Sequence, residues 1–99
     1  MTGVQFLDTL QSVIKERIEQ APEGSYTAKL AAQGKLKVAQ KVGEEAVELA
    51  LAAVAQDSAR VTAEAADLVY HLMLLLTLRE LTLADVVAEL ERRHRPAAN

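Results

Sequence analysis

The stretch KVGEEAVELALAAVAQDSARVTAEAADLVYHLMLLL, residues 41–76, decides the fold of this 99-residue chain. It predicts the end of one long helix (residues 35–56), a tight turn at Asp57 and Ser58, and a second long helix (residues 59–78). The turn is so short that the two helices must be antiparallel neighbours. No stretch of the chain shows the alternation typical of a strand.

Segments on either side of this hairpin complete an all-α domain. Apolar residues at helical spacing predict a helix over residues 4–20, and a short helix over residues 27–33 ends at Gly34. Thr82 is a candidate N-cap of a last helix, with Asp85 in a capping-box relation, and this helix frays into RRHRPAAN, residues 92–99. We therefore expect one domain (residues 1–99), a helical bundle of four main helices plus one short helix.

Composition and charge narrow the class of protein. The net charge of −3 provides no basic footprint, which argues against a nucleic-acid partner. The N-terminus lacks a signal-peptide layout, and the most apolar stretch, residues 65–78, is interrupted by Asp67 and His71 and is too short to cross a bilayer. The chain has no cysteine, which fits a reducing compartment. We expect a cytoplasmic protein with no membrane segment.

Self-association is the expected remedy for a small apolar chain. The helix over residues 59–78 is apolar on nearly every side from Ala65 onward, and 99 residues provide few helices to cover it. One side of the preceding helix is formed by small residues that allow close approach of another helix: Ala39, Gly43, Ala46, Ala50 and Ala53. We expect a homodimer or a higher homo-oligomer that completes the bundle.

Carboxylates on the two long helices are the main candidates for chemistry. Glu45 and Glu48 are three residues apart, as are Glu64 and Asp67, so each pair occupies neighbouring turns of one helix. If the pairs face one another, their repulsion favours a hard divalent cation, and oxygen ligands select Mg²⁺, with Mn²⁺ possible. Spacing alone leaves open the alternative that the glutamates form an ordinary solvated helix face.

Three lysines lie near these glutamates in the sequence, and they also allow two interpretations. Lys41 and Glu45 have the spacing of a pair that stabilises a helix. Alternatively, Lys29, Lys37 and Lys41 provide ammonium groups that bind phosphates beside a carboxylate-held metal.

Four stretches together point to one known family. They are SYTAKL (residues 25–30), KVAQKVGEEAVELALAAV (37–54), EAADLVYHL (64–72) and ERRH (91–94). They are similar to the phosphoribosyl-ATP pyrophosphatase family, a branch of the MazG-like all-α nucleotide pyrophosphohydrolases. The resemblance implies Mg²⁺-dependent hydrolysis of the α–β phosphoanhydride of phosphoribosyl-ATP, the second step of histidine biosynthesis. It also implies a dimer or larger assembly.

The resemblance also implies roles for individual residues. It implies metal ligands at Glu45, Glu48, Glu64 and Asp67, and catalytic roles for Glu44, Glu45 and Glu48, with Glu44 either a ligand or the base that positions water. For such a substrate, the lysines considered above, Lys29, Lys37 and Lys41, are the candidates for binding the phosphates. The chain departs from the family pattern at three places, since glycine is usual where Glu80 stands, an aromatic residue often replaces Ala31, and Leu36 occupies a usually basic position.

Three rival functions are compatible with parts of the sequence. The nearest is a MazG-like enzyme that hydrolyses canonical or damaged nucleoside triphosphates at the same metal site. A helical interaction module without activity leaves the Glu64 and Asp67 pair unexplained. A di-metal oxidase is suggested only by the single pair Glu91 and His94, which lies in the basic tail.

Overall fold

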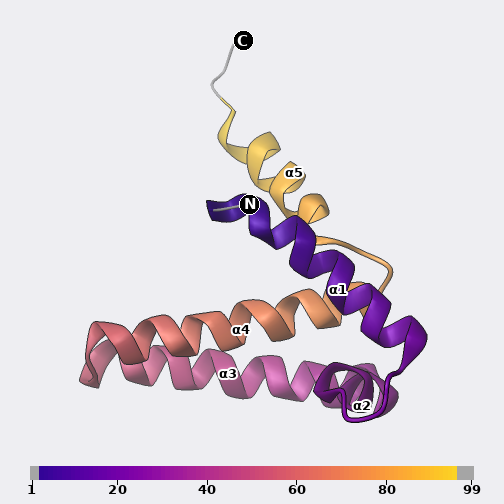
Figure 1. Ribbon diagram of the computed structural model, residues 1–99. Helices are drawn as coiled ribbons and strands as arrows, with labels where there is room; N and C mark the ends of the chain where they lie inside the picture. The colour runs from indigo at the N-terminus through magenta and orange to yellow at the C-terminus, as the bar shows by residue number, and fades with distance from the viewer. Residues whose placement is uncertain (1–2, 96–99) are drawn as a thin grey trace.

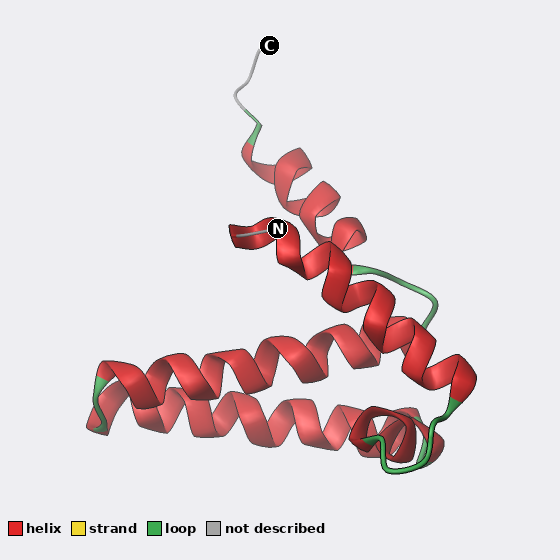
Figure 2. Cartoon of the chain, in the orientation of Figure 1, coloured by secondary structure: helices red, strands yellow, loops and turns green. Residues whose placement is uncertain are grey.

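A computed structural model describes residues 3–95, and every regular element in that range is helical (Figures 1 and 2). The all-α prediction is confirmed, with four long helices and one short helix. The first helix begins two residues later than predicted because a 3-10 turn precedes it, and the other predicted bounds agree within one residue. The elements are the 3-10 turn η1 (Gly3–Gln5), α1 (Phe6–Gln20), α2 (Tyr26–Ala32), α3 (Lys35–Ala55), α4 (Ser58–Leu78) and α5 (Leu83–His94).

The predicted hairpin is formed by α3 and α4, which run antiparallel side by side (Figure 1). The turn between them is short because Asp57 caps α4. The Asp57 side chain accepts a hydrogen bond from the Arg60 main-chain N–H at 3.0 Å. An Asp cap satisfies one of the free amides at a helix start and typically stabilises the helix by about 1 kcal/mol.

The hydrophobic core sits at the end of the hairpin that is opposite this turn. There α1 crosses the hairpin, and α2 packs against both of its helices (Figure 1). Burying one side chain of this size stabilises the fold by about 1.5–3 kcal/mol, so this junction holds the single chain together. The core cluster consists of Ile14, Leu30, Val38, Met73 and Leu74.

The last helix is joined to this junction by polar contacts and projects away from the hairpin (Figure 1). The Gln11 side-chain amide donates to Thr77 Oγ1 at 2.6 Å, and its oxygen accepts from the Leu83 main-chain N–H at 3.2 Å. The predicted capping box is confirmed, because the Thr82 and Asp85 side chains each accept a hydrogen bond from the other residue's main-chain N–H. Of the predicted frayed segment 92–99, the helix includes residues up to His94, and residues 96–99 lie outside the described range.

The end of α4 explains why glycine is usual at position 80 of the family that the sequence resembles. The Leu81 N–H donates to the Leu76 carbonyl at 2.8 Å and the Glu80 N–H donates to the Thr77 carbonyl at 2.9 Å, the two bonds of a Schellman motif. This motif places Glu80 in the left-handed region, at φ 61°. A side chain costs about 1–2 kcal/mol there, and glycine avoids that cost.

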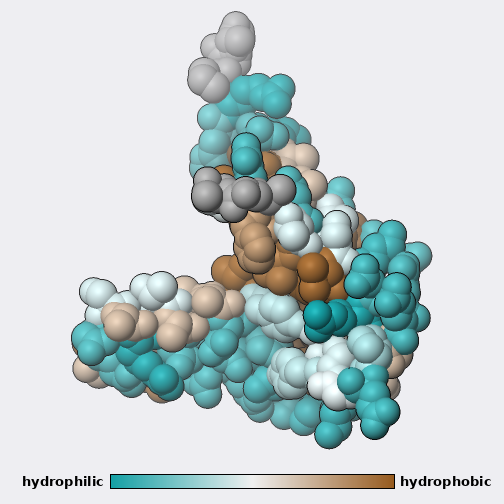
Figure 3. Space-filling view, in the orientation of Figure 1, coloured by the Kyte–Doolittle hydropathy of each residue, from teal (hydrophilic) through white to brown (hydrophobic). Residues whose placement is uncertain are grey.

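A single chain leaves much of the hairpin uncovered. On α4 only Glu64, His71, Met73 and Leu74 are buried, so one chain leaves most of the apolar surface of this helix uncovered, as the sequence predicted. The small residues on α3 are exposed too, beside large exposed apolar residues that include Leu51 and Val54 at 63% and 88%. Hydrophobic surface also gathers where α1 crosses the hairpin (Figure 3).

One described helix, α4, is long and apolar enough to span a membrane by length and composition alone. This weakens the expectation that no segment of the chain can do so. The core helix of a soluble protein meets the same criterion, so the finding is weak evidence for a membrane. Arg60, Glu64 and Asp67 add charge along the same helix.

Candidate active site

Three carboxylates meet between the two helices of the hairpin. Glu45 and Glu48 come from successive turns of α3, and Glu64 comes from the facing stretch of α4. One oxygen atom of each carboxylate lies within 4.8 Å of the others, close enough to share one cation. The spacing on α3 and the antiparallel neighbour together produce this cluster, which we call the carboxylate trio.

In each buried glutamate of the trio, one carboxylate oxygen pairs with a positively charged side chain and the other has no hydrogen-bond partner. Glu45 Oε1 lies 3.2 Å from Lys41 Nζ, and Glu64 Oε1 lies 2.8 Å from the Arg60 guanidinium. The other oxygen, Oε2, is buried in both residues and has no hydrogen-bond partner. A buried carboxylate oxygen without a partner is costly, and a bound cation removes that cost. The oxygen-only donor set suits Mg²⁺ or Mn²⁺ rather than zinc.

The ionisation of the trio follows from this arrangement. Burial opposes the charge on Glu45, but the Lys41 ammonium beside it and the neighbouring Glu48 carboxyl hold the pKa of Glu45 below its usual value. Glu48 behaves in the opposite way, because its close approach to Glu45 raises the pKa of the Glu48 carboxyl, with Glu64 adding to the effect. The trio therefore holds a proton on Glu48 more readily than on Glu45.

The other predicted site residues lie around the trio without joining it. Asp67 is exposed on α4, one turn beyond Glu64, and its carboxylate is not part of the trio. Glu44 is exposed on α3, where it accepts a hydrogen bond from the Gln40 side chain at 3.1 Å and lies 3.9 Å from Lys41 Nζ. The structure therefore brings three of the four predicted metal ligands together, and Asp67 is the exception.

The three predicted phosphate-binding lysines differ in their distance from the trio. Lys41 contacts it directly through Glu45, while Lys37 is half-buried one turn earlier on α3. Lys29 is exposed on α2 and lines a pocket of about 450 Å³ that also includes Tyr26 and Pro22. Only Lys41 therefore reaches the carboxylates in this structure.

Arg60 is a neighbour of the site that the sequence analysis did not assign. Its guanidinium pairs with Glu64, and both residues line a small pocket of about 160 Å³ together with Glu48. The i,i+4 spacing of Arg60 and Glu64 was a usable signal. Lys41 and Arg60 are thus equivalent partners of the two buried glutamates, each placed four residues before its glutamate on antiparallel helices.

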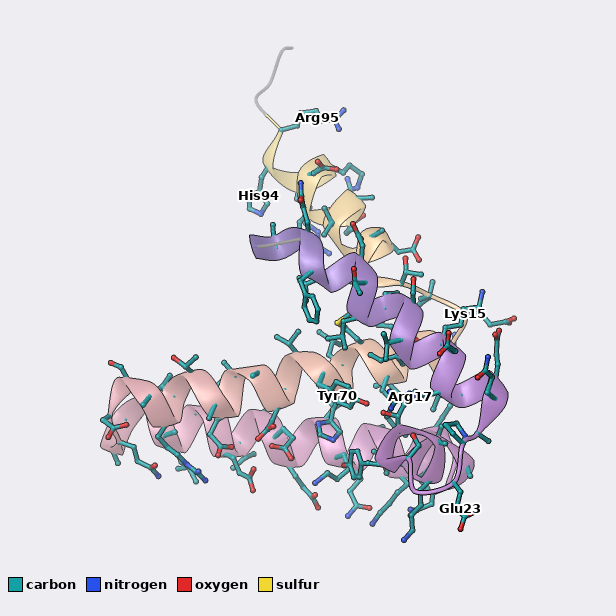
Figure 4. All side chains as sticks on the ribbon, viewed as in Figure 1. Lys15, Arg17, Glu23, Tyr70, His94 and Arg95 are labelled. Atoms are coloured by element: carbon teal, nitrogen blue, oxygen red, sulfur yellow. The ribbon has the colours of Figure 1, made fainter. Side chains whose placement is uncertain are left out.

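The pair Glu91 and His94 lies far from the trio. Figure 4 shows His94 and Arg95 at the free end of α5, away from the hairpin. These residues line a separate, shallow pocket with Leu90. The structure therefore offers no support for a di-metal centre that combines this pair with the trio.

Comparison of the sequence with known proteins identifies its relatives. A family model described as phosphoribosyl-ATP pyrophosphohydrolase matches residues 7–94. Proteins named phosphoribosyl-ATP pyrophosphatase are similar over nearly their full length, with 54% identity in Pyrobaculum neutrophilum (92% of this chain, 97% of the relative) and 50% in Metallosphaera sedula (94% and 98%).

A longer relative is similar over part of its length. The histidine biosynthesis bifunctional protein HisIE of Xanthomonas campestris is 55% identical over 92% of this chain, which spans only 44% of that relative. The matched regions include the segments of α3 and α4 that carry the trio.

Proposed function

Because this chain belongs to the phosphoribosyl-ATP pyrophosphohydrolase family, we propose that it hydrolyses the α–β phosphoanhydride of phosphoribosyl-ATP. The products are phosphoribosyl-AMP and pyrophosphate, and the reaction is the second step of histidine biosynthesis. One observation supports a metal-dependent reaction at the trio: Glu45 and Glu64 each keep a buried Oε2 without a partner, beside Glu48.

The proposed division of labour follows from the positions of the side chains. Glu45, Glu48 and Glu64 hold Mg²⁺, or Mn²⁺ in its place, and Asp67 completes the ligand set from the next turn of α4. When bound, the ion neutralises charge on the departing pyrophosphate and makes the attacking water more acidic.

The remaining residues bind the phosphates and handle the water. Lys41, already beside Glu45, is placed to bind phosphate oxygens, with Lys37 and Lys29 following along α3 and α2. Glu44 stands outside the trio beside Lys41, where it can orient the attacking water or accept its proton. We assign catalytic roles to Glu44, Glu45 and Glu48 on this basis.

The test of this function is an assay of the purified chain with phosphoribosyl-ATP, Mg²⁺ and a panel of ordinary nucleoside triphosphates. Chromatography should show phosphoribosyl-AMP and pyrophosphate, and EDTA should abolish their formation. Orthophosphate in place of pyrophosphate would contradict cleavage of the α–β bond. A preference for an ordinary nucleoside triphosphate would assign the chain to the wider group of nucleotide pyrophosphohydrolases instead.

We also propose that the chain functions in the cytoplasm as a homodimer or a larger homo-oligomer. The exposed small and apolar residues of α3 and α4 are then covered by a second copy rather than by lipid. Light scattering at micromolar concentration, without detergent, should return a molar mass of at least twice the 10.7 kDa chain mass. The substitution Leu51→Asp, in the middle of the exposed face of α3, should lower that mass, and a monomeric wild type would contradict the proposal.

A further inference from the structure

His71 is a buried histidine on α4 whose two ring nitrogens are both engaged. Its side chain is one of only four buried polar or charged residues among residues 3–95, and it is 6% exposed. Nδ1 lies 2.7 Å from the main-chain oxygen of Asp67, and Nε2 lies 2.8 Å from the hydroxyl oxygen of Tyr26. The second contact joins residues 45 positions apart and ties the first turn of α2 to α4.

The first contact fixes the direction of the second. A main-chain carbonyl oxygen only accepts hydrogen bonds, so the proton of the neutral imidazole must be on Nδ1. Nε2 is then an acceptor, and the Tyr26 hydroxyl must donate its proton to it. The Tyr26 oxygen is left with lone pairs alone, and it can only accept a further hydrogen bond. Triphosphate oxygens are acceptors too, so Tyr26 in this state is not a phosphate contact.

The position of Tyr26 places this acceptor at the edge of the site. The Tyr26 and His71 rings meet edge to face with centroids 5.8 Å apart, and Tyr70 packs on His71 in the same manner at 5.5 Å. Figure 4 shows Tyr70 on the part of α4 that approaches α2. Tyr26 as a residue is 53% exposed, although its hydroxyl end meets the buried His71 ring in a partly buried hydrogen bond.

Tyr26 also lies near Lys41, which contacts Glu45 of the trio, and it lines a neighbouring pocket. The hydrogen bond to Glu45 is the main cause of the raised pKa of Lys41, and Tyr26 contributes to it, as does Glu44. Tyr26 also lines the 450 Å³ pocket together with Lys29. A nucleotide that had its phosphates on the trio and on Lys41 and extended toward this pocket would pass Tyr26.

We propose that Tyr26 is a substrate-binding residue whose oxygen accepts a hydrogen bond from a ribose hydroxyl of the nucleotide, and that His71 is the positioning residue that sets this polarity. The inference rests on the proposed function and extends it to the sugar. A sugar hydroxyl is the donor that stands next to the phosphate chain, whereas the amine of the base lies farther along the molecule. The fixed acceptor thus favours ribonucleotides over deoxynucleotides.

The test compares substrates and variants in one cycle. Steady-state kcat and KM are measured for wild type, Tyr26→Phe and Tyr70→Phe, with phosphoribosyl-ATP and with its analogues that lack the 2′ or the 3′ hydroxyl on the ATP-derived ribose. Tyr70→Phe is the matched control, since it removes a hydroxyl from a ring that contacts His71 only edge to face. In the wild type, loss of one of the two hydroxyls should raise KM about tenfold, the value of one hydrogen bond, with kcat nearly unchanged.

Tyr26→Phe should show the same increase in KM on phosphoribosyl-ATP and no further loss on the deoxy analogue, while Tyr70→Phe should behave as wild type. Equal losses in wild type and Tyr26→Phe for both analogues would overturn the assignment of the ribose hydroxyl. A wild type that discriminates against neither analogue would overturn it as well.

The role of His71 is tested by coupling. His71→Leu removes the nitrogen that accepts the Tyr26 proton, so the Tyr26 hydroxyl can rotate. KM should rise toward the Tyr26→Phe value without exceeding it, and the double variant should be no worse than Tyr26→Phe. His71→Gln returns an acceptor to the site and should recover part of the loss, which also keeps the test informative if the leucine variant does not fold. Losses that multiply in the double variant would show that His71 does not act through Tyr26.

The outcome remains distinct from that of the proposed function. If the wild type releases pyrophosphate from ATP but not from phosphoribosyl-ATP, the proposed substrate is wrong. The same cycle with ATP, 2′-deoxy-ATP and 3′-deoxy-ATP then decides the role of Tyr26.

Discussion

We expect Glu45→Gln to lower kcat for hydrolysis of phosphoribosyl-ATP by about a thousandfold. The substitution removes the charge of a buried, proposed ligand, so it weakens the ion pair with Lys41 and leaves the proposed cation site weaker. Losing one preorganised electrostatic contact in an active site typically costs a hundredfold to a thousandfold, about 3–4 kcal/mol, and a metal ligand belongs at the upper end. Initial rates at saturating Mg²⁺ and substrate provide the measurement.

The control for this experiment is Glu16→Gln, the same chemical change at an exposed position of α1. It should leave kcat within a factor of two, an order-of-magnitude bound for a surface change. Glu64→Gln and Asp67→Asn extend the test to α4, and both should cause losses of the same order as Glu45→Gln. If the Glu45→Gln enzyme kept a tenth of the wild-type rate, the proposal that the trio takes part in the reaction would be wrong.

Magnesium should raise the melting temperature of the wild type by about ten degrees or more. At a hundredfold excess over its dissociation constant, a ligand that binds only the folded state stabilises it by about 2.7 kcal/mol. In a domain of this size, each kcal/mol is worth about 4–8 degrees. The physical source is the relief of the two unpartnered oxygens and of the repulsion between Glu45 and Glu48. Thermal scans in EDTA and in Mg²⁺, at one fixed protein concentration, would measure it.

Glu48→Gln isolates the repulsion within the trio. The raised pKa of Glu48 means that the folded state binds a proton more tightly than the unfolded state does. The stability of the metal-free wild type must therefore fall as the pH rises from the usual glutamate value through the raised one. In EDTA above that window, Glu48→Gln should melt at or above the wild-type temperature, and this advantage should vanish at lower pH.

The response of the variants to Mg²⁺ decides which carboxylates are ligands. Glu48→Gln and Asp67→Asn should show little of the wild-type rise, whereas Glu16→Gln should show all of it. Asp67 is the informative case, because its carboxylate is exposed and lies outside the trio in this structure. An Asp67→Asn chain that melts much lower in EDTA and still responds fully to Mg²⁺ would make this carboxylate structural.

The fold was predictable where local rules act. Helix bounds follow from apolar periodicity and from caps such as Asp57 and Thr82, whose partners lie within three residues. The proximity of the carboxylates on α3 to those on α4 was predictable as well, because a tight turn makes the two helices antiparallel neighbours.

The contacts between helices were not predictable in the same way. Spacing sets the angle of a side chain on its own helix, but not the rotation and axial shift of one helix against its neighbour. These decide that Glu64 enters the trio while Asp67 stays outside, and that Tyr26 meets His71 across 45 residues. His71 is buried with both ring nitrogens engaged, and nothing in the sequence revealed that one partner is Tyr26.

Cohesion is distributed unevenly along the hairpin. Of the six buried apolar side chains among residues 3–95, five are gathered at the junction of α1, α2, α3 and α4, and only Ala52 lies toward the turn at Asp57. Backbone amides beyond the trio should therefore exchange with deuterium through local opening, at a free energy well below that of global unfolding. The trio lies between the core junction and the turn at Asp57. A ligand bound at the trio should therefore hold α3 and α4 together farther from the core. Substrate binding should then reduce local opening of the hairpin near Asp57.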